Sequence, residues 1–505
     1  MTVGDQAPPR GGLAAAGASG AITTFGGQLL RIAIQLTGVV VLARLLDPKD
    51  YGLIAMVTAI IGVGEVFRDF GLSSAAIQAK SVSREQKSNL FWINTSIGLA
   101  LALIVCAASG GIAALYDDER LVLVSLALSS TFLLNGIITQ FRADLTRKLQ
   151  FVRLTSVEVA SQLIGLAAGI VLAALGAGYW ALVAQQVVHH LVQLVILVIV
   201  TDWFPAGIYR RVEMKPFLGF GANIVGAQLL GYASRNADSV VIGATLGAGP
   251  LGLYNRAFQL MLLPLNQLNA PSTRVALPIL SRLQEDRDRF ASFIIFGQSV
   301  MLNVVCFVFA FVGAQAYAII AIALGDQWLA SVPIFQILLV AGLFQTAGYA
   351  TYWAFLAKGL TRSNLHYALV SRPIMVVLVV VGVIWGVNGV AAGYALGSLL
   401  LWPLGLWWIG RVSDVPVAAM FWNGMRALIA YSVATAASYL STYFIDPDEL
   451  VLRLAVGFTA LVAAVALIAL IWPRFRRDLV AIAGARRYLR RERSGGAPTP
   501  EDSPE

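Results

Sequence analysis

The stretch Gly26-Gly-Gln-Leu-Leu-Arg-Ile-Ala33 returns two hundred positions later as Gly226-Ala-Gln-Leu-Leu-Gly-Tyr-Ala233. The match continues without gaps, and ten of the 28 positions from 26 to 53 are identical to those from 226 to 253. Self-similarity at a fixed offset is the sequence signature of a repeated structural unit. The chain is therefore predicted to contain two similar halves.

The composition is that of a membrane protein. Of the 505 residues, 58% are hydrophobic and 12% are charged, and the mean hydropathy is +0.76. Soluble proteins carry about 25% charged residues, so this chain is predicted to be an all-α integral membrane protein. Its two cysteines, Cys106 and Cys306, lie in apolar runs and offer neither a disulfide framework nor a zinc-binding spacing.

Apolar segments long enough to cross a bilayer follow one another along most of the chain. A transmembrane helix needs about 20 mostly apolar residues. By this criterion we predict about 14 transmembrane helices, at 22–45, 51–79, 88–115, 120–141, 152–175, 178–201, 216–246, 250–280, 290–316, 330–357, 363–386, 388–410, 420–443 and 449–472.

Positive charge is concentrated on alternate connections between these spans. Arg10, the alternate connections and the segment after residue 473 together hold 25 of the 36 lysines and arginines. This asymmetry predicts a multi-pass protein with both termini in the cytoplasm. It also accounts for the net charge of +9, so binding to nucleic acid is not required.

The repeat and the spans together predict the architecture. The first and seventh spans correspond and both start from the cytoplasm, so the repeat is direct and its axis runs along the membrane normal. We expect two six-helix lobes around a central cavity, followed by two extra C-terminal helices. The predicted parts are a flexible N-terminus (1–20), the N-lobe (21–202), the C-lobe (216–410), the last two spans (420–472) and a basic cytoplasmic tail (473–505). The tail is either an amphipathic helix on anionic lipid or a simple stop-transfer cluster.

Polar side chains form stripes on repeat-related helices. Arg31 and Gln35 share one face of the first span, and Arg235 and Asp238 share one face of the seventh. Arg256 starts a similar stripe in the eighth span. Such stripes would line a hydrated cavity between the lobes, because charged side chains are costly in lipid.

Arginines outnumber acids at depth in the spans. A guanidinium matches phosphate oxygens, so this excess predicts a path for an anionic substrate. Charge pairs that only stabilise the bundle, such as Arg235 with Asp238, are the alternative. For Arg44, Arg274 and Arg426, near span ends, we expect snorkelling to the interface. The deep arginines are Arg31, Arg68, Arg235, Arg256 and Arg372, and the deep acids are Glu65, Asp69 and Asp238, with Glu158 nearer the cytoplasm.

Several classes of function are disfavoured. The sequence has no Gly-x-x-x-x-Gly-Lys-Ser/Thr motif for ATP and no His-Glu-x-x-His motif for a metal. No predicted external loop exceeds about a dozen residues, too few for an enzyme that binds sugar outside. We therefore expect no cofactor, no metal and no enzyme activity. Transport would be driven by the membrane potential, H⁺ or Na⁺, with Glu65, Asp69 or Asp238 as coupling groups.

Two blocks of sequence resemble a known family. Arg68-Asp-Phe-Gly-Leu-Ser-Ser-Ala-Ala-Ile-Gln78 and Leu253-Tyr-Asn-Arg-Ala-Phe-Gln-Leu260 are similar to the polysaccharide-transporter branch of the multidrug/oligosaccharidyl-lipid/polysaccharide (MOP) exporter superfamily. The resemblance implies a V-shaped two-lobe fold with a cationic cavity, in which Arg68, Asp69, Asn255 and Arg256 occupy the recurrent blocks.

The function that this resemblance implies is a flippase. It would move an undecaprenyl-pyrophosphate-linked oligosaccharide to the outer leaflet of the bacterial cytoplasmic membrane by alternating access. We expect a monomer that works beside a glycan polymerase and export machinery. The alternatives are a drug/cation antiporter of the same superfamily and a membrane-bound polysaccharide polymerase or ligase. The recurrent blocks, together with depth and stripe position for the other residues, assign binding of the substrate to Arg31, Gln35, Arg68, Arg235, Asn255, Arg256 and Arg372.

Overall fold

The computed structural model describes residues 10–64, 82–210, 212, 214, 232 and 235–493. Every regular element in this part of the chain is a helix, which confirms the predicted all-α class. The chain divides into two compact units, unit 1 (Met1–Asn255) and unit 2 (Arg256–Glu505), and each is described separately. The division falls inside a helix, and the lobes predicted from the sequence stay a prediction.

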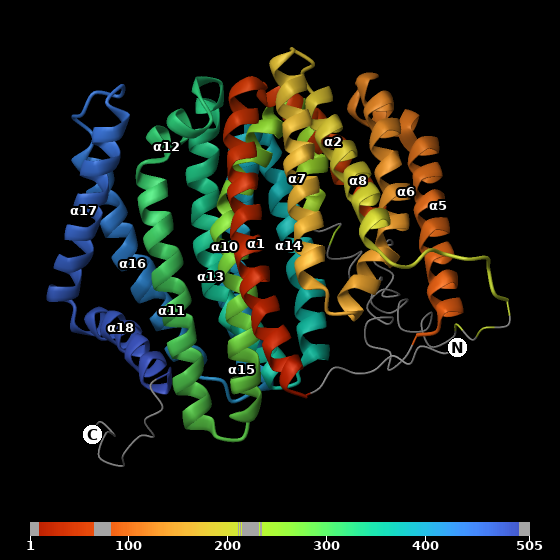
Figure 1. Cartoon of the computed structure of the whole chain (residues 1–505). Coiled ribbons are helices and arrows are strands. Elements are labelled where there is room, and N and C mark those ends of the chain that lie inside the picture. Colours follow the sequence, from red (N-terminus) through yellow and green to blue (C-terminus); the bar gives the residue numbers. More distant parts are fainter. Residues whose placement is uncertain are drawn as a thin grey trace. The chain divides into compact units, whose positions relative to one another are not determined.

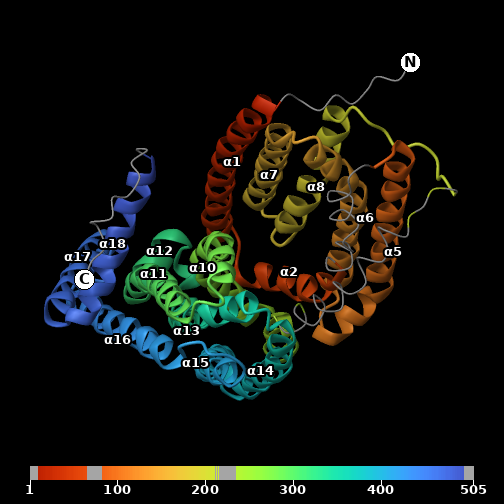
Figure 2. The same cartoon turned by 90° about the horizontal axis from the view of Figure 1, so that it is seen from below.

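Unit 1 contains pairs of long helices. The pair α5 and α6 and the pair α7 and α8 each lie side by side (Figures 1 and 2), and α1 packs on α7. Helical backbone also covers residues 235–246. The bounds are α1 Arg10–Leu45, α2 Pro48–Ile61, α5 Arg84–Tyr116, α6 Arg120–Arg147, α7 Phe151–Ala174 and α8 Trp180–Val200.

Local sequence explains where these helices start. Ser83 precedes α5 and accepts a hydrogen bond from the Gln86 amide at 3.1 Å, while the Gln86 side chain accepts one from the Ser83 amide at 2.9 Å. This capping box satisfies amides that have no partner within the helix. At α2, Asp47 and Asp50 form a second capping box, and Pro48 occupies the first turn, where no amide hydrogen is needed.

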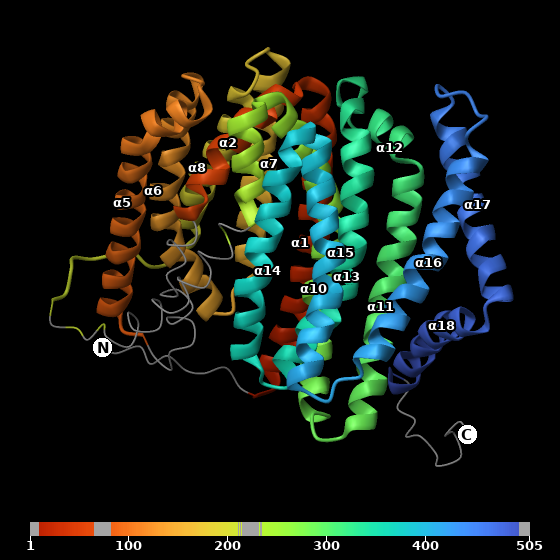
Figure 3. The same cartoon turned by 180° about the vertical axis from the view of Figure 1, so that it is seen from behind.

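Unit 2 contains the remaining helices and a large apolar core around α11 and α13. Phe290, Trp353 and Trp402 are among its buried rings. The neighbouring helices α14 and α15 run side by side (Figure 3). The bounds are α10 Ala248–Arg282, which begins in unit 1, α11 Arg287–Ala314, α12 Ala316–Ala323, η1 Asp326–Ser331, α13 Val332–Ala357, α14 Thr361–Gly382, η2 Val383–Trp385, α15 Gly386–Val412, α16 Val417–Ser441, α17 Leu450–Ile471 and α18 Pro473–Arg493.

The predicted number of fourteen spans is not confirmed. In the described residues, nine segments are long and apolar enough to cross a membrane, and one of them, Thr361–Val412, combines α14 and α15. The helices α10 and α16 are not among them, and α2 has 14 residues, while the predicted span 51–79 lies outside the described residues from residue 65 on. The predicted span 216–246 lies mostly outside the described residues.

Two repeat-related glycines bring α2 and the start of α10 into backbone contact. A Cβ atom on Gly52 would lie 1.7 Å from the Ala248 carbonyl oxygen, and one on Gly252 would lie 1.8 Å from the Pro48 carbonyl oxygen. Each contact is thus the counterpart of the other, shifted by the two hundred residues of the repeat. Small residues let membrane helices approach this closely.

A buried carboxylate ties α5 to the end of α6. The Asp144 side chain is fully buried, and its two oxygens lie 2.6 Å from Lys87 Nζ and 2.8 Å from Lys148 Nζ. Because both lysines are partly exposed, water screens part of this interaction.

Asp144→Asn should lower the free energy of unfolding by about 1–2 kcal/mol, because an amide cannot balance two ammonium groups. Thermal unfolding in detergent would measure it. Asp202→Asn is the control, since the Asp202 side chain is 76% exposed and 3.7 Å from Arg153, and it should have almost no effect. Equal loss in both variants would contradict a structural role for Asp144.

Candidate functional site

Three charged side chains from three helices meet in unit 1. Arg31 of α1 and Arg142 of α6 both bind the carboxylate of Glu158 on α7. In the ion pair between Arg142 and Glu158, Arg142 Nη2 lies 2.7 Å from Glu158 Oε1. Arg31 also donates a hydrogen bond to Gln28 Oε1 at 2.5 Å. We call Arg31, Arg142 and Glu158 the Arg–Glu–Arg cluster.

Glycines on α1 position Arg31 for this contact. A Cβ on Gly27 would lie 2.0 Å from Thr155 Cγ2, and one on Gly38 would lie 2.9 Å from Leu166 Cδ1. Gly27, Arg31 and Gly38 therefore share the face of α1 that packs on α7. Because both glycines lack side chains, the helices lie close and the Arg31 guanidinium reaches Glu158.

The cluster carries an excess positive charge and is partly exposed. Two guanidinium groups share one carboxylate, which leaves a net charge of +1 and several N–H donors with no partner among the described residues. The side chains of Arg31, Arg142 and Glu158 are 29%, 47% and 14% exposed. Guanidinium groups that keep free donors in a partly dry site can bind the oxygens of a phosphate or pyrophosphate group.

The sequence interpretation missed two members of this cluster. It placed Arg142 in a cytoplasmic connection and treated Glu158 only as an acid near the cytoplasmic end of a span. A signal was available in the sequence. Arg142 and Glu158 lie on either side of the short turn between α6 and α7, and such a turn brings the residues before and after it onto facing helix surfaces.

Asp238 lies in a different setting in unit 1. Its side chain is buried and accepts hydrogen bonds from the Tyr254 hydroxyl and the Ser239 amide, each at 2.7 Å. Among the described residues it has no ion pair with Arg235, which is exposed. The described donors to this carboxylate are thus a tyrosine hydroxyl and a backbone amide rather than the guanidinium that the sequence suggested.

Arg256 belongs to unit 2 and is 5% exposed. Its guanidinium carbon lies 5.7 Å from the centroid of the Trp328 ring, and Nη1 is 3.3 Å from Gln259 Oε1. Stacking on an aromatic face stabilises a cation that is largely removed from water. Asn255, the last residue of unit 1, is partly buried.

The remaining predicted residues are not drawn into a cluster. Gln35 and Arg372 are exposed, as is Arg235. Glu65, Arg68 and Asp69 lie outside the described residues, and their roles stay predictions. In the described part of the chain, no group of three or more His, Cys, Asp or Glu side chains is placed to hold a metal ion.

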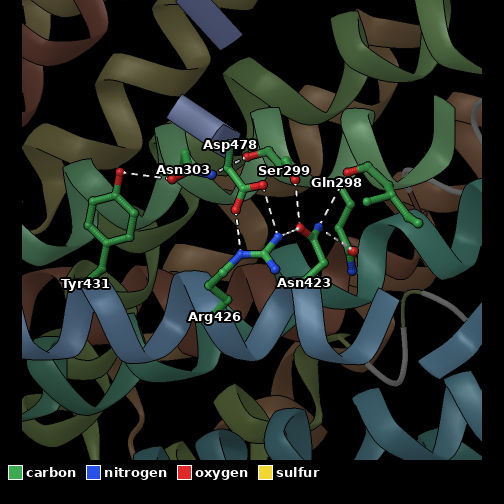
Figure 4. A network of polar contacts seen from close by, with 8 residues as sticks. Gln298, Ser299, Asn303, Asn423, Arg426, Tyr431 and Asp478 are labelled. Carbon is green, nitrogen blue, oxygen red and sulfur yellow. Dashed lines mark hydrogen bonds and ion pairs between the residues drawn. The ribbon is translucent and has the colours of Figure 1, made fainter. Parts of the chain in front are cut away.

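Arg426 has an ion-pair partner that the sequence interpretation did not predict. It forms a bidentate ion pair with Asp478 of α18, with distances of 2.6 and 3.0 Å (Figure 4). It also donates to Asn423 at 2.7 Å, and Asn423 in turn contacts Gln298 and Ser299 of α11. This polar network stabilises the packing of α16 and α18 on α11.

Comparison with known proteins gives consistent results. The model of a family described as "Polysaccharide biosynthesis protein" matches residues 41–333. The lipopolysaccharide biosynthesis protein WzxC of Escherichia coli K12 is 26% identical over 393 residues, which cover 76% of this chain and 78% of WzxC.

Two solved structures share the fold. The lipid II flippase MurJ matches with a TM-score of 0.67 over 92% of this chain and 100% of MurJ, at 15% identity. An inward-facing multidrug transporter of the MATE family in the MOP superfamily matches with a TM-score of 0.56, over 79% of this chain and 98% of that transporter, at 16% identity. These matches confirm the predicted MOP-type fold, and the chain is a multi-pass membrane protein.

Proposed function

The chain belongs to the polysaccharide biosynthesis protein family, and from this premise we propose that it is a flippase for lipid-linked oligosaccharides. It moves an undecaprenyl-pyrophosphate-linked glycan from the cytoplasmic to the outer leaflet of the bacterial inner membrane, with both termini in the cytoplasm. It is a transport protein rather than an enzyme, and alternating access between two halves moves the substrate.

The Arg–Glu–Arg cluster is the observation that supports this proposal most strongly. In the proposed orientation α6 ends at the cytoplasm, and Arg142 lies five residues before its end at Arg147, which corresponds to about 8 Å. A pyrophosphate group entering from the cytoplasm would meet the cluster early in its path. The lipid tail would stay in the bilayer, because only the charged head needs a polar path.

The membrane potential gives the movement a direction. Each negative charge that moves outward across an inside-negative membrane gains about 2.3 kcal/mol per 100 mV. A pyrophosphate diester with two charges would therefore gain about twice that amount. No cofactor is needed for this step, and proton or sodium coupling through Glu65, Asp69 or Asp238 would add to it.

Asp238 is the coupling candidate that lies in the described part of the chain. Its carboxylate is buried and its described partners are uncharged. Binding a proton or a cation would lower the cost of burying this carboxylate. This property suits a group that takes up an ion at one stage of a transport cycle.

Reconstitution tests the function directly. In liposomes that contain the purified chain, a fluorescent undecaprenyl-pyrophosphate oligosaccharide should reach the outer leaflet, so that external dithionite bleaches more than the outer half of it. Empty liposomes are the control and should lose only that half. If the lipid stayed in place while a cationic dye crossed in exchange for protons, the chain would be a drug/cation antiporter. Formation of longer glycan without movement would identify a polymerase or ligase.

A further inference from the structure

The helix α18 is fixed to unit 2 by one apolar and one ionic contact. Phe475 is fully buried, and its ring centroid lies 5.7 Å from that of Tyr431 on α16. One turn later Asp478 forms its bidentate pair with Arg426. Both contacts lie on one face of α18, three residues apart, so the helix is docked along that face.

The preceding helix places α18 at the edge of the bilayer. Leu470 and Ile471, at the end of α17, are 71% and 72% exposed, as expected of side chains that face lipid. After Trp472 the chain turns sharply, and α18 packs against the ends of α11, α16 and α17 (Figures 1 and 3). A tryptophan at this point is typical of the interface between hydrocarbon and headgroups.

The exposed surface of α18 is cationic: Arg476, Arg477 and Val480 lie opposite Phe475 and Asp478, and Arg474 flanks the docked side. Arg474, Arg476 and Arg477 are exposed. Asp478 is the only acid between Pro473 and Gly484, and its charge is neutralised by Arg426 on the docked side. Val480 is 63% exposed beside the arginines and adds an apolar contact to this face. We call Arg474, Arg476, Arg477 and Val480 the α18 face.

We propose that the α18 face binds the phosphate groups of anionic phospholipids in the leaflet next to it. The charge of the face complements such headgroups, and its valine suits the boundary with the acyl chains. Asp478 serves this arrangement because it docks the helix while its negative charge is neutralised by Arg426. This surface is separate from the Arg–Glu–Arg cluster, and the proposal does not depend on the transported substrate.

Lipid-dependent thermal stability of the full chain tests the proposal. In a neutral detergent, added phosphatidylglycerol should raise the Tm at lower concentrations than phosphatidylcholine does. The triple variant Arg474→Gln, Arg476→Gln, Arg477→Gln should need much more phosphatidylglycerol for the same shift. Each arginine near an anionic surface accounts for about a fivefold change in affinity, so three account for on the order of 100-fold.

A matched variant keeps the test specific. Arg282→Gln, Arg287→Gln, Arg289→Gln removes the same charge from three exposed arginines around the α10–α11 turn. It should respond to phosphatidylglycerol as the wild type does, and all three proteins should have the same Tm without added lipid. The proposal is overturned if both triple variants lose the response equally or if neither does. It is also overturned if inorganic phosphate gives the same stabilisation as the lipid.

Discussion

Gly52→Leu should remove most of the folded protein from detergent extracts. The added Cβ would lie 1.7 Å from the Ala248 carbonyl oxygen, and the two atoms behind that oxygen are also backbone atoms within 3 Å. A clash with a flexible side chain can be relieved by a rotamer change, whereas here two helices must separate. Overpacking costs about 3 kcal/mol or more in such a case, a large part of the stability of a typical protein.

Fluorescence-detected size-exclusion chromatography after heating would measure this loss. Gly252→Leu should behave like Gly52→Leu, because its Cβ meets the Pro48 carbonyl oxygen at 1.8 Å. Gly110→Leu is the matched control, since nothing lies within 4 Å of a Cβ at Gly110 in α5. Wild-type stability in Gly52→Leu would show that α2 and α10 do not make this contact.

Arg31→Gln should lower the rate of lipid-linked oligosaccharide transport by at least about tenfold. A hydrogen bond to a charged group contributes about 1.5–3 kcal/mol, which corresponds to roughly 10- to 100-fold in affinity. Because Arg142 still holds Glu158, the substitution leaves no bare carboxylate behind. The fold should therefore survive, and the thermal stability should stay close to that of the wild type.

Glu158→Gln should have the opposite effect on binding. The carboxylate competes with any anion for both guanidinium groups, and a neutral amide competes less. Inorganic pyrophosphate should therefore bind Glu158→Gln several-fold more tightly than the wild type in calorimetric titrations. Arg153→Gln on the same helix is the control and should change neither binding nor transport. Weaker binding in Glu158→Gln would mean that the cluster only holds the helices together.

Hydropathy was sufficient to predict most of the fold. The predicted spans 88–115 and 120–141 correspond to α5 and α6, and the segment 449–472 corresponds to α17. A long apolar run has few alternatives in a bilayer, because its backbone must satisfy its own hydrogen bonds. The predicted number of spans stays a prediction, because polar side chains make helices such as α10 less apolar and one predicted span, 216–246, lies mostly outside the described residues.

The partners of the charged residues could not be predicted. Arg31 and Glu158 are 127 residues apart, and Arg426 and Asp478 are 52 residues apart. Periodicity places a residue on a helix face but does not identify the helix that packs there. For this reason the sequence did not reveal that Arg426, which lies near a span end where an arginine can snorkel, pairs with Asp478.

The reciprocal contact at Gly52 and Gly252 has the symmetry of a homodimer interface. In a twofold dimer, residue i of one copy touches residue j of the other, and j touches i in return. Here the two copies are joined in one chain, so this geometry is expected if an ancestral dimer was fused by gene duplication. Before fusion, a substitution at the glycine that became Gly52 and Gly252 would have changed both symmetric contacts of the interface at once. After fusion each half could change alone, as it has where Asp69 in one repeat corresponds to Asn269 in the other.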